Sequence, residues 1–355
     1  MDNKFWKNKK VFITGHTGFK GSWLCLLLYS LGAKITGYSL DPITKPNLFD
    51  DLNLKKFLVK DYRHDIENLK KLKKAVKDFN PSIVLHLAAQ SSVLASYENP
   101  LKTVSTNVLG TANILETIKN TKSIRSALIV TTDKVYLNLE KKKKFNENSK
   151  LGGYDLYSSS KAACDIISES YLNSFLSKKC GLGIVRSGNC IGGGDWTKDR
   201  IIKDCVESFS KNKQLMIRSP NATRPWQHVL DPLCGYLNLT KKLYHNKKKY
   251  SGSWNFGPNK KNNLQVKEIA KIGRKIFKSK SKISYGKKKY YESENLALDS
   301  SKSKKMLKWE TKFFDKSALD LTFNWYKKYY DFENKKELVN LSFSQIELFK
   351  NKHSI

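Results

Sequence analysis

Apolar and polar positions alternate in blocks through the first half of the chain. Short apolar runs, typical of buried strands, are each followed by a stretch whose apolar positions recur every three or four residues, as on one face of a helix. The predicted strands are residues 10–14, 35–40, 57–60, 82–87, 127–131 and 182–186. The predicted helices are residues 22–31, 66–79, 103–119 and 155–176. Strands that alternate with helices indicate an α/β fold with a doubly wound parallel sheet, whose ligands bind at the carboxyl ends of the strands.

The pattern becomes less regular after about residue 188. The predicted elements beyond it are short strands and helices at 214–217, 253–256, 201–210 and 266–277. We therefore expect a Rossmann-type domain over residues 1–188. Residues 189–355 are expected to form mainly a smaller mixed α/β substrate lobe, with some segments returning to the first domain. Residues 342–345 have the spacing of a capping box ahead of a short helix.

The composition indicates a soluble protein with a sizeable core. The chain has 355 residues, 39% of them hydrophobic, which suffices for two domains or for one domain with an attached lobe. Its longest apolar run, residues 23–31, is too short to cross a membrane, and the first residues lack the pattern of a signal peptide. The six cysteines show no metal-ligand spacing. We therefore expect a cytoplasmic protein with neither a metal site nor a membrane partner.

The formal net charge of +34 has the sign that nucleic-acid binding usually gives. Only 7 of the 66 basic residues are arginine, however, and the lysines are spread along the whole chain without aromatic–basic motifs. This distribution favours a compositional bias, so no nucleic-acid partner is expected, and a basic nucleic-acid-binding protein is a remote alternative. One stretch gathers four of the arginines, as expected where bidentate donors are required: Arg186, Arg200, Arg218 and Arg224.

A glycine-rich turn follows the first predicted strand. The segment TGHTGFKGSW has the spacing G-x-x-G-x-x-G between a strand and a helix. Glycines there let the backbone approach a pyrophosphate, whose charge then faces the helix N-terminus. The spacing alone is a weak signal of a dinucleotide site, but the strand–turn–helix context favours such a site over a purely structural turn. The residues of the turn assigned to cofactor binding are Gly15, His16, Thr17, Gly18, Phe19 and Gly21.

Two carboxylates follow the next predicted strands. Asp41 lies 20 residues after Gly21, at the end of the second predicted strand. A carboxylate at that place accepts hydrogen bonds from a ribose diol and repels a 2′-phosphate, which favours NAD over NADP. Asp61, after the third predicted strand, is a candidate contact for the adenine amino group. The alternative for either residue is a charge on the protein surface.

A tyrosine and a lysine lie four residues apart in the segment YSSSK. Tyr157 and Lys161 therefore share one face of a predicted helix. A lysine ammonium near a phenol lowers the tyrosine pKa, which makes Tyr157 a feasible base for an alcohol proton as hydride departs; Lys161 is also a candidate to hold the nicotinamide ribose. Thr132 offers a hydroxyl to the same substrate oxygen. Such a pair is a frequent chance match in a chain with 17 tyrosines, but the glycine turn and the threonine pair at 131–132 strengthen it.

Longer segments carry a family resemblance. The glycine turn, VLHLAAQ at 84–90, STNVLGT at 105–111 and YSSSK resemble the extended short-chain dehydrogenase/reductase family. More narrowly, GHTGFKGSW, TTDKVY, GGYDLYSSSK, RSGNCIGGGDW, RPWQHVLDPL and WNFGP look like segments of the CDP-glucose 4,6-dehydratases. The resemblance implies NAD as cofactor, CDP-glucose as substrate, and a role in making deoxysugars for surface polysaccharides. The further cofactor contacts that it implies are Leu87, Ala88, Ala89 and Thr106.

The resemblance also assigns roles to the segment TTDK. It implies that Tyr157 takes the proton of the 4-hydroxyl while the C4 hydride moves to NAD, so that the new ketone acidifies the C5 proton; the hydride later returns to C6. Asp133 is then the general acid at O6, and Lys134 is the candidate base at C5, which requires a lysine pKa well below its ordinary value. Two alternatives stay open for Lys134: stabilising the enolate while water takes the proton, or forming a surface ion pair with Asp133. A 4-epimerase needs neither residue.

The same resemblance indicates the substrate contacts and the assembly. Arg224 is a candidate for bidentate contact with the substrate pyrophosphate. The complete set of implied substrate contacts is Gln90, Asn189, Arg200, Arg218, Arg224 and Glu292. Leu94 stands where the family pattern has an arginine, which keeps another sugar, another nucleotide or a 4-epimerase open as alternatives. A homodimer or a dimer of dimers, paired through the helix that carries Tyr157, is the implied assembly.

Overall fold

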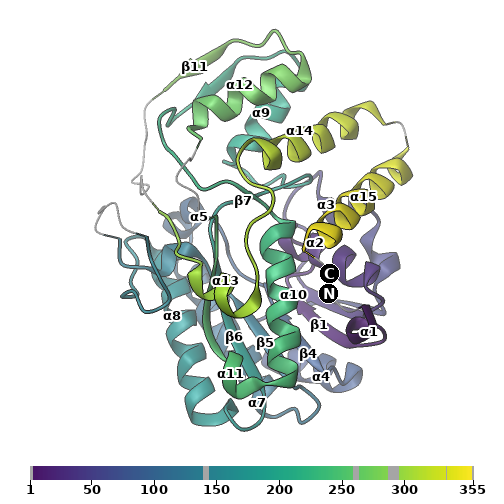
Figure 1. Cartoon of the computed structure of the whole chain (residues 1–355), viewed down its shortest axis with the longest axis vertical. Helices are drawn as coiled ribbons and strands as arrows, with labels where there is room; N and C mark the ends of the chain where they lie inside the picture. The colour runs from purple at the N-terminus through teal and green to yellow at the C-terminus, as the bar shows by residue number, and fades with distance from the viewer. Residues whose placement is uncertain (1–2, 139–143, 259–263, 287–295, 333, 354–355) are drawn as a thin grey trace.

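Seven parallel strands form the central sheet of the protein (Figure 1). The computed structural model describes residues 3–138, 144–258, 264–286, 296–332 and 334–353. The strands of the sheet are β1 (Lys10–Thr14), β2 (Lys34–Ser39), β3 (Lys60–Arg63), β4 (Ile83–His86), β5 (Ser126–Val130), β6 (Gly181–Ser187) and β10 (Gly252–Phe256). Their order is β10-β6-β5-β4-β1-β2-β3, and β1 pairs with both β2 and β4. The chain therefore runs outward from β1 in two directions, which confirms the predicted doubly wound parallel sheet.

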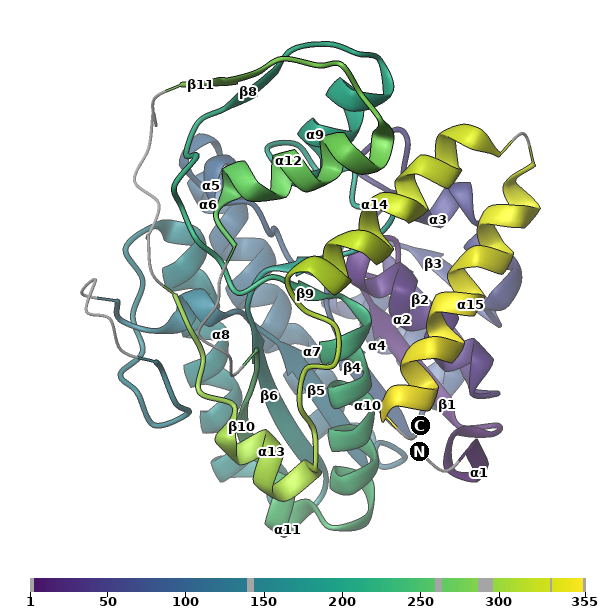
Figure 2. The same cartoon turned by 45° about the horizontal axis from the view of Figure 1, so that its top comes forward.

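Helices cover both faces of this sheet (Figures 1 and 2). The helices on one face are α4 (Leu69–Phe79), α7 (Gly110–Lys119) and α8 (Leu156–Tyr171). The helices on the other face are α2 (Phe19–Ser30) and α10 (Leu230–His245), with α15 (Lys335–His353) packed across both. The pleat divides each strand between these layers, because Phe12 belongs to the first core and Val11 and Ile13 belong to the second.

The remaining elements are short or lie outside the main sheet. The other helices are α1 (Asn3–Trp6), α3 (Leu48–Asp51), α5 (Val93–Glu98), α6 (Pro100–Val104), α9 (Ile201–Ser210), α11 (Lys247–Tyr250), α12 (Val266–Phe277), α13 (Ser301–Leu307) and α14 (Lys316–Asp331). The 3₁₀ and π turns are η1 (Leu54–Phe57), η2 (Ser105–Leu109), η3 (Asp133–Val135) and η4 (Leu172–Leu176). Two small parallel ladders pair β7 (Cys190–Ile191) with β9 (Gln227–His228), and β8 (Leu215–Ile217) with β11 (Ile283–Tyr285).

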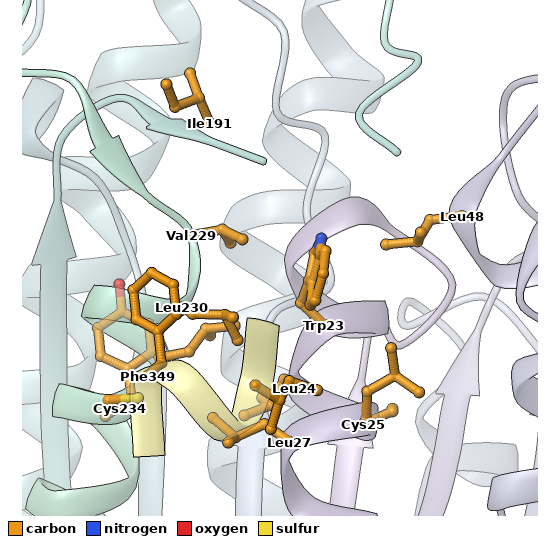
Figure 3. Close-up of a cluster of buried hydrophobic side chains, with 14 of the residues drawn as sticks. Trp23, Leu24, Cys25, Leu27, Leu48, Ile191, Val229, Leu230, Cys234 and Phe349 are labelled. Atoms are coloured by element: carbon orange, nitrogen blue, oxygen red, sulfur yellow. The ribbon is translucent and has the colours of Figure 1, made fainter. Parts of the chain in front are cut away.

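The core between α2, α10 and α15 fixes the helix that follows the glycine turn. Figure 3 shows Trp23, Leu24 and Leu27 of α2 close to Leu230 of α10 and Phe349 of α15. These side chains are all buried, and each such burial contributes roughly 1.5–3 kcal/mol. The indole N–H of Trp23 also donates to the carbonyl of Gly193, at 2.9 Å. Helix α2 is therefore held on several sides, which fixes the position of its N-terminus.

A smaller lobe stands over the carboxyl ends of the strands (Figure 2). It contains α9, α12 and the β8–β11 ladder, and α14 packs against α9 and α12. Helix α12 begins with a capping box in which the Glu268 carboxylate accepts the backbone N–H of Gln265 at 2.7 Å. Among the described residues, no helix combines the length and the apolar character that a membrane crossing requires.

Three sequence expectations differ from the structure. The third strand lies at 60–63 instead of 57–60, because it is the edge of the sheet and its half-exposed residues do not form an apolar run. Residues 253–256 belong to β10, which joins the main sheet beside β6. The expected capping box at 342–345 is wrong: Ser342 lies inside α15, where its hydroxyl donates to the carbonyl of Leu338 and accepts from the indole of Trp325. The domain boundary near residue 188 stays a prediction.

Candidate active site

A cavity of about 710 Å³ lies between the carboxyl edge of the sheet and the lobe. Its wall on the sheet side is formed by the segments that follow β1, β2, β4, β5 and β6. Its wall on the lobe side includes α9 and residues between 216 and 226. Because β1 pairs with β2 on one side and with β4 on the other, the cavity lies at the switch point of the sheet, the usual ligand site of this architecture.

The glycine turn forms one end of the cavity. Gly15 has a φ of +74°, and a Cβ there would lie 2.6 Å from the backbone nitrogen of Ala88. A Cβ on Gly21 would collide with the carbonyl oxygen of Gly15. Gly18, by contrast, is exposed to the cavity, and the nearest atom to its hypothetical Cβ is 3.5 Å away. The turn therefore leaves open backbone in front of the N-terminus of α2, where N–H groups and the helix dipole favour a pyrophosphate.

The two predicted carboxylates lie in different surroundings. Asp41 lines the cavity, and its side chain is 86% exposed and 3.5 Å from the Arg63 guanidinium. Asp61 lies inside β3 and outside the cavity lining, because the strand begins three residues later than expected. Its carboxylate accepts from Arg63 at 2.7 Å and lies 2.8 Å from the imidazole Nε2 of His16, which is likewise absent from the lining. The carboxylate that follows β3 and does line the cavity is Asp65.

The segment after β5 and the start of α8 bring the predicted catalytic residues together. Thr132, Asp133 and Lys134 form the N-terminus of η3, and all three line the cavity with Tyr157. Tyr157 lies in the first turn of α8, which begins where the Asp155 carboxylate accepts the backbone N–H of Ser158 at 2.9 Å.

Lys161, one helical turn beyond Tyr157, lines the same cavity and is buried. Its ammonium donates to the carbonyl of Val130 at 3.0 Å. Burial lowers the pKa of Lys161, and the nearby Lys20 ammonium lowers it further.

Burial shifts the proton affinities of the two acidic groups in the same direction. It raises the pKa of the Asp133 carboxyl, against the opposing charge of Lys134 and a hydrogen bond from the Thr132 hydroxyl at 3.0 Å. Burial also raises the pKa of Tyr157, against the contact with Thr132 and the charges of Lys20 and Arg200. The expectation that Lys161 leaves Tyr157 with a lowered pKa is therefore wrong for this structure. The two cations that favour its phenolate most are Lys20 and Arg200.

Lys134 is half-buried and lines the cavity. No ion pair within 4.0 Å joins its ammonium to Asp133, although both residues are among those described. The Asp133 carboxylate instead lies against Gly188, where a Cβ would be 3.0 Å from its Oδ2. The structure thus differs from the surface ion pair considered as an alternative for Lys134.

A buried ion pair fixes the two strand ends around the site. The Arg186 guanidinium donates to both carboxylate oxygens of Asp165, at 2.6 and 2.9 Å, and Asp165 also accepts from the Thr131 hydroxyl at 3.0 Å. This network joins β6, α8 and the end of β5. Arg186 is therefore a structural bidentate donor, and its position in the arginine-rich stretch does not make it a substrate contact.

The lobe presents three arginines to the cavity in different states. The side chains of Arg200 and Arg218 are about half exposed, and Arg218 pairs with Asp199 at 2.8 Å. Arg224 is buried, and its guanidinium donates to the carbonyl of Thr223 at 2.8 Å. Asn189, after β6, also lines the cavity.

The other expected contacts are distributed unevenly. Leu87, Ala88, Ala89 and Thr106 line the cavity. The Gln90 side chain does not, because its amide donates to the Thr103 hydroxyl at 2.8 Å and its carbonyl accepts from the backbone of Ser92. Glu292 lies outside the described residues.

Comparisons with known proteins give this site a family. The family model described as GDP-mannose 4,6 dehydratase matches residues 12–318. The chain belongs to this nucleotide-sugar dehydratase family. A CDP-glucose 4,6-dehydratase of Salmonella typhimurium is 42% identical over 334 residues, which cover 92% of this chain and 93% of that protein. A dTDP-D-glucose 4,6-dehydratase of Dictyostelium discoideum is 30% identical over 63% of this chain and 53% of its own.

Solved structures share the fold of this dehydratase-family chain. A UDP-glucose 4-epimerase from Thermotoga maritima, solved with UDP-glucose, superposes with a TM-score of 0.79 at 19% identity, covering 90% of this chain and 99% of its own. A dTDP-glucose 4,6-dehydratase from Bacillus anthracis, solved in complex with NAD, has a TM-score of 0.76 at 24% identity and covers 93% of this chain and 99% of its own. At these identities the likeness establishes the fold, including the sheet and the lobe above it.

The family member has cavity residues that the sequence analysis did not single out. Lys20 of α2 lines the cavity beside the catalytic segment, and Asp204 of α9 lines it on the lobe side. A lysine in the first turn of a helix looks like a solvated surface charge, so its sequence position carries no signal of burial. Leu94, the departure from the family pattern, also lines the cavity and leaves that part of the wall apolar.

Proposed function

We propose that this protein is an NAD-dependent dehydratase that converts CDP-D-glucose into CDP-4-dehydro-6-deoxy-D-glucose. The 42% identity to a CDP-glucose 4,6-dehydratase, over nearly the full length of both chains, supports the substrate. The observation that carries the reaction type is the placement of Asp133 and Lys134 in the same cavity as Thr132 and Tyr157. A 4-epimerase requires the tyrosine but has no step for the other two groups.

The cavity has the features that a dinucleotide requires. Gly15 and Gly21 allow the tight turn, and Gly18 leaves open backbone before the N-terminus of α2. The exposed carboxylate of Asp41 is placed at the end of β2 to accept a ribose diol, which favours NAD over NADP. NAD, when bound, supplies the acceptor for the C4 hydride and returns that hydride to C6.

Tyr157 and Thr132 act on the 4-hydroxyl of the hexose. Tyr157 removes the hydroxyl proton, and Thr132 donates a hydrogen bond to the same oxygen. Lys161 holds its ammonium one turn below Tyr157 through the Val130 carbonyl, where it can orient the nicotinamide ribose. The buried surroundings exclude water, so the 4-ketone forms without loss of the sugar to bulk solvent.

Asp133 and Lys134 carry out the elimination. The raised pKa of Asp133 keeps its carboxyl protonated to higher pH than an exposed aspartate, as a general acid at O6 requires. Lys134 reaches into the cavity without pairing to Asp133, so each group is available for its own step. Lys134 removes the C5 proton that the ketone has made acidic, and Asp133 delivers a proton to the departing 6-hydroxyl.

The lobe binds the nucleotide part of the substrate. Arg224 is the principal contact for the pyrophosphate because it is buried in the cavity wall and presents a planar donor. Arg218 and Arg200 assist from the more open side, and Asn189 lies near the sugar phosphate. In this proposal residues 1–188 bind NAD and residues 189–355 mainly bind the nucleotide sugar, with β10 and α10 returning to the sheet.

We also propose that the protein works in the cytoplasm as a homodimer or a dimer of dimers. Its six cysteines are free thiols, as in a reducing compartment. Exposed apolar side chains occur on the same side as α8, including Leu101 of α6, Leu109 of η2 and Ile166 of α8. A pair of copies that joined through these helices would bury them. Light scattering coupled to gel filtration tests this, and a monomer at micromolar concentration would contradict it.

A panel of nucleotide-glucoses tests the function. The purified protein with NAD should convert CDP-glucose, and not UDP- or dTDP-glucose, into a 4-keto product that absorbs in alkali. NADP in place of NAD should support much less turnover. Conversion of UDP- or dTDP-glucose instead would refute the base assignment, and CDP-galactose as the product would refute the dehydration. A matched assay with CDP-mannose and other CDP-hexoses tests whether the apolar Leu94 wall has changed the sugar.

A further inference from the structure

Lys20 is a second buried lysine of the active site, and the proposed reaction has assigned no role to it. It is the second residue of α2, directly after the glycine turn, and it lines the cavity. Its ammonium donates to the hydroxyl of Ser187 at 2.9 Å, and that hydroxyl also accepts from the Tyr236 phenol at 2.9 Å. Ser187 ends β6, so Lys20 reaches from the dinucleotide turn across to the strand end that carries Asn189.

The position of Lys20 puts its charge beside both proton-transfer groups. Asp133 lies against Gly188, the residue that follows the Ser187 partner of Lys20. Burial disfavours the ammonium, but Cys190, Tyr236, Tyr157 and Asp133 around it raise the pKa of Lys20 above its ordinary value. Lys20 therefore keeps its proton at neutral pH, so it supplies a fixed charge and cannot act as a base.

The groups that face Tyr157 come from several elements. Asp133 of η3 disfavours the phenolate, whereas the Thr132 hydroxyl, Lys20 of α2 and Arg200 before α9 favour it. Arg200 is half exposed and lies 4.0 Å from Asp195, so solvent and that carboxylate screen its charge. Lys161, on the same helix as Tyr157, is bonded to the Val130 carbonyl. Lys20 is thus the buried cation that acts most directly on the phenol.

We propose that Lys20 is a positioning residue for the oxidation at C4: its ammonium, held by Ser187, provides the positive charge that stabilises the Tyr157 phenolate. This inference rests on the proposed function. It divides the two tasks that the sequence pattern assigned to Lys161 alone, leaving Lys161 to hold the cofactor ribose and Lys20 to favour the phenolate. A side chain that enters through the helix after the glycine turn links cofactor binding to base activation.

Replacement of Lys20 tests the proposal. Lys20→Met keeps the length and apolar stem of the side chain but removes the charge, and Lys20→Arg keeps the charge. In Lys20→Met the pH at which C4 oxidation is half-maximal should rise by about one unit or more, so that turnover at neutral pH falls by about 10- to 100-fold. Lys20→Arg should restore most of the turnover and the original pH profile. The exposed Lys211→Met is the matched control and should leave both unchanged.

A direct titration separates this proposal from the function itself. The 13Cζ resonances of labelled tyrosines report phenol ionisation, and Tyr157→Phe identifies the Tyr157 signal among the 17 tyrosines. In Lys20→Met, the Tyr157 signal should titrate at higher pH than in the unmodified protein, with or without turnover of CDP-glucose. An unchanged Tyr157 titration in a folded Lys20→Met protein would overturn the role of Lys20. Absence of CDP-glucose turnover in the unmodified protein would overturn the proposed function and leave the titration result to stand by itself.

Discussion

The two ends of the cavity differ in how they hold their charged groups. At the sheet end, Asp133 and Lys161 are 3% and 5% exposed, and each is fixed by a hydrogen bond to a neighbouring group. At the lobe end, Arg200 and Arg218 are about half exposed, and Arg218 pairs with a surface carboxylate. Burial shifts proton affinities, which chemistry requires, whereas exposure leaves cations free to exchange a carboxylate partner for a phosphate. The same cavity thus divides into a part that reacts and a part that recognises.

The largest predicted effect comes from removing the phenol at the sheet end. Tyr157→Phe removes the base for the 4-hydroxyl, and turnover should fall by about 10²- to 10⁴-fold. The measurement is the rate of 4-keto product formation from CDP-glucose at saturating substrate. Tyr171→Phe, on the same helix but hydrogen-bonded to Glu116 away from the cavity, is the matched control and should retain its rate. Equal rates in the two variants would contradict the role of Tyr157.

The second prediction separates the two chemical steps within the sheet end. Lys134→Ala should spare the oxidation at C4 but slow the loss of water by about 10²-fold or more, because it lacks the group that acts at C5. Rapid mixing should show reduced nicotinamide accumulating, and in D₂O no deuterium should enter C5. Asp133→Asn should show the same accumulation, since it cannot protonate O6. Normal turnover of Lys134→Ala would show that water or another group takes the C5 proton.

The third prediction concerns pH. Tyr157 must lose its proton to act, and burial raises its pKa, so C4 oxidation should accelerate as pH rises. Asp133 must keep its proton, so the elimination should slow as pH rises through its raised pKa. Turnover should therefore be bell-shaped in pH, changing about tenfold per unit on each limb, while KM changes little. A KM that follows the same bell would indicate that binding, and not proton transfer, titrates.

The smallest predicted effect belongs to the lobe end. Arg218→Lys keeps a positive charge but loses the bidentate donor, and the exposed site should limit the rise in KM to about two- to fivefold, with kcat unchanged. Steady-state kinetics at several salt concentrations provide the measurement. Arg274→Lys, whose guanidinium donates to the Ser281 carbonyl in the lobe away from the cavity, is the control. A kcat effect larger than the KM effect would place Arg218 in the reacting part of the cavity.

Regular periodicity accounts for what could be predicted of the fold. The central strands are buried on both faces, so β1, β4 and β6 read as apolar runs in the sequence. The edge strand β3 is half exposed, so its polar residues KDYR gave no such run, and the error moved the expected adenine contact from Asp65 to Asp61. The helix α15 could not be placed because its capping-box spacing arises by chance within a continuous helix.

The site was predictable where residue type and spacing determine it. The glycine turn, the spacing of Tyr157 and Lys161, and the segment TTDK all reach the cavity. Side-chain direction is not encoded in spacing: Gln90 turns back to Thr103, and His16 turns to Asp61. Lys20 was missed because its burial depends on β6 and α10, which meet it only in the folded chain.

The most direct test of a single reacting centre follows one hydride. CDP-glucose labelled with deuterium at C4 should give a product in which that deuterium is at C6, because one cofactor takes and returns it over one hexose. A mixture with substrate that is unlabelled at C4 but carries 13C should show no deuterium in the 13C product, as mass spectrometry can establish. Deuterium lost to solvent, or found in the 13C product, would contradict the convergence of these groups on one bound sugar.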